Sequence, residues 1–137
     1  MPLSFSVTVR NARLDAIETA IGTIPILKIR SGSAPANTAT ADSGAVLATL
    51  ALPSDWLAAA SAGSKAIAGG PWQDSAADAA GTAGHFRIYA ADGATCHLQG
   101  SIQPASVGGG DMILDNVVFA VGQAFTITAF TLTDGNG

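Results

Sequence analysis

The side chains best suited to chemistry in this 137-residue chain gather in one short stretch. Five polar or aromatic residues recur at alternate positions around a single turn: His85, Arg87, Tyr89, His97 and Gln99. Imidazole nitrogens are good zinc ligands, but two histidines are too few for a zinc site. The guanidinium of Arg87 beside them would also repel a cation. We therefore expect no metal, and we expect these residues to form a polar sheet face that contacts solvent or a partner.

Arrangements typical of an enzyme are missing from the sequence. The chain has no Gly-x-Ser-x-Gly segment, which presents the nucleophile in many hydrolases. Its glycine runs at 69–70 and 108–110 lack the Lys-Ser/Thr pair that follows a phosphate-binding loop. Its aspartates do not have the spacing of a calcium loop. The sequence therefore predicts a protein that is not an enzyme and that binds no cofactor.

The element that positions the polar residues is a β-hairpin predicted for residues 84–102. Apolar and polar residues alternate there on both sides of a compact turn. A three-residue loop would pair Phe86 with Leu98 and Ile88 with Cys96. This register places the apolar residues of both strands on one face, as burial requires. It also predicts that Cys96, the only cysteine, is a small buried residue.

Other alternating segments predict strands at 3–9, 26–30, 45–52, 111–119 and 123–133, with a bulge near Thr128 or Ala129 where the apolar phase changes. One short helix is predicted for 12–21, with Asn11 as its N-cap. Trp56 and Trp72 are expected to anchor a region of small residues to the core.

This pattern favours an all-β chain, folded as a single domain over residues 1–137. An antiparallel β-sandwich with one N-terminal helix is the expected architecture, and a jelly roll is the candidate arrangement.

Charge and composition exclude some classes of partner. The net charge is −4, and charged residues make up 12% of the chain, against about 25% in ordinary soluble domains. Nucleic acid is not expected as a partner, because phosphate binding needs clustered Lys and Arg. No segment is apolar over the ~20 residues that cross a membrane, and no signal-peptide pattern is visible. Residues 1–30 carry four basic and two acidic side chains, which predicts a mildly basic end on an acidic body.

Several phrases of the sequence resemble a family of small proteins from tailed bacteriophages and prophages: NARLDAIETAIG, LPSDW, WQDSAADAAGTAGHFRIY, GDMILDN and FTLTDGNG. The likeness spans nearly the whole chain. It implies a structural protein of the virion, made in the host cytoplasm, and most simply a cement or decoration protein of the head. The implied partners are the major capsid protein and copies of the chain itself, as a dimer or trimer. No catalytic residues come with the resemblance.

Cement proteins bury surface between capsid subunits, which favours extended arms. The candidate arms are residues 1–10, 33–44 and 133–137, and the candidate contacts of the arms are Phe5, Arg10, Arg13, Asn37 and Asp42. Two alternatives remain open. One is a neck, tail or baseplate component of the same particle. The other is a carbohydrate-binding or adhesion module that uses Trp56, Trp72 or Tyr89 as a stacking platform.

Overall fold

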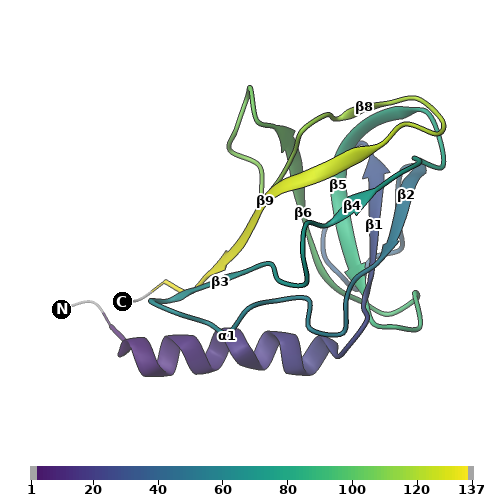
Figure 1. Ribbon diagram of the computed structural model, residues 1–137. Coiled ribbons are helices and arrows are strands. Elements are labelled where there is room, and N and C mark those ends of the chain that lie inside the picture. The colour runs from purple at the N-terminus through teal and green to yellow at the C-terminus, as the bar shows by residue number, and fades with distance from the viewer. Residues whose placement is uncertain (1–2, 136–137) are drawn as a thin grey trace.

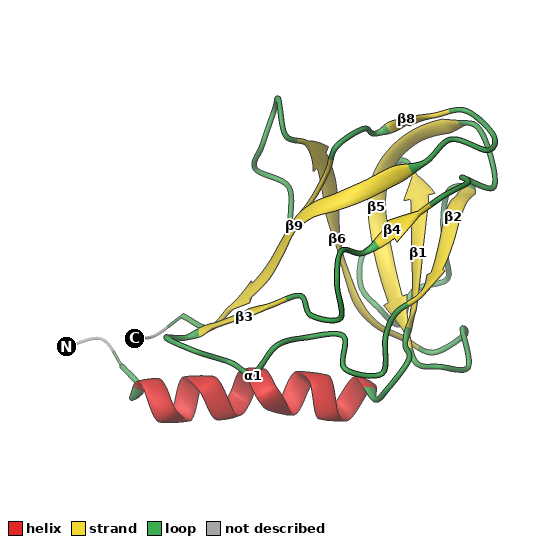
Figure 2. Cartoon of the chain, viewed as in Figure 1, coloured by secondary structure: helices red, strands yellow, loops and turns green. Residues whose placement is uncertain are grey.

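The structure, a computed structural model, describes residues 3–135. Within this range the chain forms one helix and nine strands (Figures 1 and 2). In chain order they are α1 (Val7–Ile21), β1 (Ile26–Ser31), β2 (Val46–Ala51), β3 (Ser64–Ala66), β4 (Gln73–Asp74), β5 (Gly81–Tyr89), β6 (Cys96–Pro104), β7 (Met112–Leu114), β8 (Val118–Phe119) and β9 (Phe125–Thr133).

The nine strands form one curled sheet. Its order is β2-β1-β5-β6-β7-β9-β3, with β4 paired to β9 and β8 paired to β5. The sheet bends so far that β4, beyond β9, comes to lie beside β2 (Figure 1). The prediction of a mostly β chain with one helix is confirmed. The prediction of purely antiparallel pairing is wrong, because β6 and β7 run parallel, and a β-sandwich or jelly roll is not confirmed.

The hairpin of β5 and β6 forms, but in a different register from the predicted one. Phe86 lies opposite Gly100, and Ile88 lies opposite Leu98. The slip from the predicted pairing is two residues, which leaves the side chains of 85–89 and 98–102 on their predicted faces, since side chains alternate with a period of two. The core face therefore agrees with the prediction, and Phe86 and Ile88 are both fully buried.

A bulge near the turn corrects the prediction for Cys96. Tyr89 lies opposite Cys96, so His97 is an extra residue without a partner on β5. The bulge turns Cys96 to the polar face, where its Sγ accepts a hydrogen bond from Nε of Arg87 at 3.1 Å. The turn is longer than predicted because the Asp92 carboxylate accepts hydrogen bonds from the backbone N–H groups of the two residues that follow Gly93.

At the N-terminus the predicted strand 3–9 is wrong. Ser6 caps a helix there, and its side chain accepts a hydrogen bond from the N–H of Val9. Helix α1 therefore begins at Val7, ahead of the predicted N-cap Asn11, and it ends before Gly22 as predicted. The side chains of Val7 and Val9 are exposed. They alternate with polar residues over only a few positions, and this short pattern predicted a strand where the Ser6 cap stabilises a helix instead.

The segment between β2 and β4 joins the helix to the sheet. It contains β3, a strand that the sequence did not predict. Trp56 and Trp72 are buried, as predicted, with ring centroids 6.0 Å apart. Trp72 also contacts Phe130 of β9. The predicted bulge in β9 is confirmed, because Thr128 is skipped in the pairing with β7.

Candidate interaction surfaces

Loop 32–44, which connects β1 to β2, covers the polar face of β1, β5 and β6. The side chains of this face come from neighbouring positions in the sheet: Arg30 lies opposite His85, and Arg87 lies opposite Gln99. The loop has no apolar residue pattern with which to bury itself, so hydrogen bonds hold it in place. It is the segment 33–44 that the sequence predicted to be an extended arm, and here it lies against its own sheet.

Arg87 is the centre of this contact. Its side chain is only 1% exposed. The guanidinium donates hydrogen bonds to the backbone carbonyl oxygens of Thr38 at 2.8 Å, Thr40 at 3.1 Å and Asn37 at 3.4 Å. It also forms an ion pair with Asp42. One buried cation therefore supplies donors to much of the loop, which suits the fork of five N–H groups on arginine.

Asp42 joins three polar side chains beneath the loop. It receives hydrogen bonds from Tyr89 Oη at 2.6 Å, from Arg30 Nη2 at 3.0 Å and from Arg87. Burial acts to raise the pKa of Asp42, but the hydrogen bond from Tyr89, the charge of Arg30 and the contacts with Arg87 outweigh it and lower the pKa overall. The Asp42 carboxylate therefore stays ionised and pairs with the positive charges of Arg30 and Arg87.

The remaining residues of the predicted partner face differ in how far they are buried. His85 is fully buried, with Nδ1 2.8 Å from the carbonyl oxygen of Gly32. Gln99 donates from Nε2 to the carbonyl oxygen of Pro35 at 2.7 Å. His97 is exposed in the bulge. The expectation that this face meets solvent or a partner is therefore wrong for His85, Arg87 and Tyr89. Any partner here would contact loop 32–44 and His97, which stays a prediction.

The other candidate arm residues tie the two ends of the described chain together. Arg10 donates from Nε and Nη2 to the carbonyl oxygen of Asp134, at 3.1 and 2.9 Å. Arg13 forms an ion pair with the Asp134 carboxylate at 3.0 Å and lies over the ring of Phe5, 5.0 Å from its centroid. The arms predicted at 1–10 and 133–137 thus bind each other within residues 3–135. Residues 1–2 and 136–137 lie outside the described residues.

A second buried cation, which the sequence did not single out, holds α1 against β3. The Lys65 side chain is 1% exposed, and its Nζ lies 2.7 Å from Asp15 and 2.8 Å from Glu18. It also donates to the carbonyl oxygen of Ala58. Burial acts to lower the pKa of Lys65, but the two carboxylates outweigh it and raise the pKa. The only sequence signal was a single lysine in a region of small residues.

These contacts use every basic side chain of the protein. All six lysines and arginines lie within the described range, and each has a partner in the same chain. Arg10 and Arg13 bind Asp134, Arg30 and Arg87 bind Asp42, and Lys65 binds α1. Lys28 lies 5.0 Å from the centroid of the Tyr89 ring and donates to the carbonyl oxygen of Gly93. In the basic end predicted from the sequence, Arg10 and Lys28 form no ion pair and the Arg13 side chain is 49% exposed, so the positive charge of this end is only partly neutralised.

The acidic side chains are left in excess. Six aspartates form no ion pair within residues 3–135: Asp55, Asp74, Asp78, Asp92, Asp111 and Asp115. Arg10 and Lys28 also form no ion pair in this range, so the side chains without an ion pair carry a net negative charge. Charge would therefore favour a basic partner over an acidic one.

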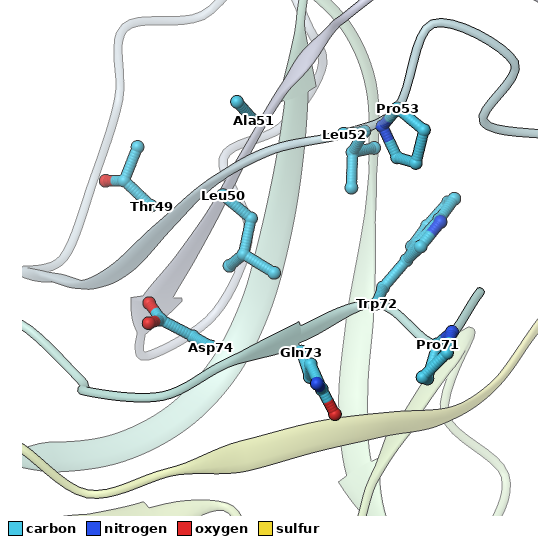
Figure 3. Close-up of a pocket in the computed structure, with 9 residues that line it drawn as sticks. All are labelled: Thr49, Leu50, Ala51, Leu52, Pro53, Pro71, Trp72, Gln73 and Asp74. Atoms are coloured by element: carbon cyan, nitrogen blue, oxygen red, sulfur yellow. The ribbon is translucent and has the colours of Figure 1, made fainter. Parts of the chain in front are cut away.

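A cleft separates β2 from β4, where the curled sheet fails to close (Figure 3). Its volume is about 320 Å³, and residues 49–53 and 71–74 line it. Leu50 and Leu52 point into it from β2, and Trp72 points toward them from the other side (Figure 3). All three are buried, so they form an apolar floor. Asp74 is the charged residue of the lining.

A second cleft, of about 410 Å³, lies where α1 ends and is lined by Glu18, Thr19, Gly22, Thr23, Ser54 and Asp55.

Elsewhere, seven large apolar side chains are exposed: Leu3, Val7, Val9, Ile24, Val107, Val118 and Val121. Scattered single apolar residues are normal on a protein surface. Two pairs are close in sequence, however, at the start of α1 and around β8.

The described residues contain no group of three His, Cys, Asp or Glu side chains that could hold a metal ion. None of the described chain forms a helix that is long and apolar enough to span a membrane. Trp56, Trp72 and Tyr89 are all buried, which removes the exposed aromatic platform on which the carbohydrate-binding alternative depended.

Comparison with protein-family models, with curated proteins and with solved structures finds no match to the chain.

Proposed function

We propose that this chain is a non-enzymatic structural protein of a phage particle, and most simply a cement or decoration protein that bridges subunits of the capsid. The observation that carries the proposal is the character of the surface. Exposed apolar side chains lie in pairs at the start of α1 and around β8, while four of the six lysines and arginines form ion pairs within the chain. Such a surface is suited to contacts with other proteins, whose interface cores are poor in charged residues.

The rigidity of the scaffold supports the same proposal. Loop 32–44 is held by Arg87, and the chain ends are tied through Asp134, so the contact surfaces are ordered before any partner binds. A preorganised surface avoids the entropy cost of ordering a flexible arm during binding. Many weak contacts of this kind would add up when copies bind to a repeating lattice. The resemblance of the sequence to small phage proteins suggests that this lattice is the capsid of a phage particle.

The number of copies per particle tests this proposal. The chain should be quantified by mass spectrometry in purified particles of the phage that encodes it, relative to the major capsid protein. Hundreds of copies would support a cement protein that covers the shell. A few copies would instead favour the neck, tail or baseplate alternative, and absence from the particle would overturn the proposal.

A further inference from the structure

Most of the exposed large apolar side chains gather at two places on the molecule. Five of the seven lie in two short segments of the chain: Leu3, Val7, Val9, Val118 and Val121. The first three lie at or just before the start of α1, and the last two lie in or just after β8. The start of α1 and β8 are at opposite ends of the molecule (Figure 1). Grouped apolar side chains on a surface mark contact sites, whereas single ones do not.

The end of the molecule at the start of α1 is basic. Residues 3–13 contain two arginines and no acidic residue. Arg13 is 49% exposed, and it lies one helical turn from Val9, on the same side of the helix. Arg13 pairs with Asp134, whereas Arg10 donates to a backbone carbonyl oxygen and keeps its charge unpaired. Two arginines against one aspartate leave this apolar end with one positive charge in excess.

The end of the molecule at β8 is acidic. The segments that form it, residues 72–83 and 115–126, contain three aspartates and no lysine or arginine. The N–H of Gly122 donates to the carbonyl oxygen of Ala77, which holds the two segments together. Asp78, the next residue, is exposed and forms no ion pair within the described range. This second apolar end therefore carries an excess of negative charge.

The two ends are both apolar, and their charges are opposite. Two copies that met through the same end would bring like charges together, which disfavours a symmetric contact. Contact between the α1 end of one copy and the β8 end of the next pairs opposite charges instead, and it repeats from copy to copy. Each apolar patch consists of a few side chains, so the area buried is smaller than the ~1,600 Å² of a standard interface. We therefore expect a weak contact, which a repeating array of copies would strengthen.

We propose that copies of this chain bind one another head to tail. The exposed apolar side chains at the start of α1 in one copy pack against those around β8 in the next, and Arg10 and Arg13 of the first copy face the aspartates of the second. This inference goes beyond the proposed function, because it names two surfaces and the partner, and it holds whether or not the chain belongs to a phage particle.

Sedimentation of the full chain tests the association. The average mass should rise as the concentration is raised to about 0.5 mM, a range suited to a small interface. The association constant should fall about threefold or more between low and high salt, because salt screens the opposite charges. Spectra of the ¹⁵N-labelled chain locate the contact: the amides of residues 3–13 and 117–122 should shift with concentration, while those of β1 should not.

Two variants decide whether the contact is head to tail. Val9→Gln alters the α1 end and Val121→Gln alters the β8 end, and each alone should weaken association about tenfold or more. An equimolar mixture of the two should regain wild-type affinity but stop at a dimer, because each variant keeps one intact end. The matched control is Val107→Gln, which changes an exposed valine between β6 and β7 and should have no effect. Melting temperatures show whether the variants fold, and Val118→Gln replaces Val121→Gln if that variant does not.

Three results would overturn the inference. The first is a monomer at every concentration. The second is a mixture of the two variants that does not associate, or a loss of association in one variant alone, because a symmetric contact through one end gives that result. The third is an equal loss from Val107→Gln, or an association that becomes stronger as salt is added.

Discussion

Arg87 offers the sharpest test of how loop 32–44 is held. Replacing it with methionine keeps an unbranched apolar stem but removes the donors to Thr38, Thr40 and Asp42. Breaking a buried ion pair by removing one partner costs about 3 to 5 kcal/mol. The Asp42 side chain is 39% exposed and keeps its contacts with Arg30 and Tyr89. We therefore expect a loss near the lower limit, about 3 kcal/mol of the free energy of unfolding.

Urea unfolding followed by tryptophan fluorescence measures this loss. With a slope of about 1.5 to 2 kcal/mol per molar urea, the midpoint should fall by about 1.5 to 2 M. Hydrogen exchange should accelerate first in residues 33–44, because the loop loses its anchor while the pairing of β5 with β1 persists.

The matched control for this experiment is Arg13→Met. Arg13 also pairs with an aspartate, but its side chain is 49% exposed, and exposed pairs contribute less than about 1 kcal/mol. If both variants lost the same stability, or if Arg87→Met left the exchange of residues 33–44 unchanged, the loop would not be held as we argue.

Three further predictions concern other parts of the fold. Lys65→Met should lower the free energy of unfolding by about 2 kcal/mol, because the buried Lys65 cation pairs with both carboxylates of α1. Hydrogen exchange in α1 should also become faster. Unchanged exchange in α1 would contradict this role. Gly84→Ala should lower the melting temperature and reduce the free energy of unfolding by about 1 to 3 kcal/mol, because the added Cβ would lie 2.2 Å from the carbonyl oxygen of Gly32. The control is Gly135→Ala, whose Cβ meets no atom within 4 Å and should leave the melting temperature unchanged. Backbone hydrogen bonds from Thr95 and Ala94 lower the pKa of Asp92 from 3.8 to about 2. Its contribution is therefore present above about pH 4 and is lost as the pH falls toward 2. The melting temperatures of the wild type and Asp92→Asn should converge over that range, and a constant difference would refute the assignment.

The faces of the hairpin were predictable from the sequence, whereas its register was not. Alternation decides which side of the sheet a residue faces, so Phe86 and Ile88 were correctly placed in the core. The pairing of the strands depends instead on the turn, where Asp92 holds a longer loop than the one assumed. The bulge that follows moved Cys96 to the polar face. A bulge leaves no mark in the apolar pattern when the residues around it are small or polar.

The contacts of loop 32–44 were out of reach of sequence patterns. Arg87 binds backbone carbonyl oxygens of the loop, and a carbonyl is present whatever the residue type. The burial of Lys65 was equally hidden from the sequence, because its two partners lie 47 and 50 positions away in the chain. The clefts could not be predicted either, since they depend on how far the sheet curls.

The contact between α1 and Asp134 has a consequence for how the protein unfolds. Arg10 and Asp134 are 124 positions apart, so the contact closes almost the whole chain into a ring. Helix α1 would otherwise be held to the sheet mainly through β3 and Trp56. With the ring closed, the helix cannot leave without opening β9 at its end, which couples two regions that could have melted separately. We therefore expect a single cooperative transition for helix and sheet, and two transitions once Arg10 is replaced by methionine.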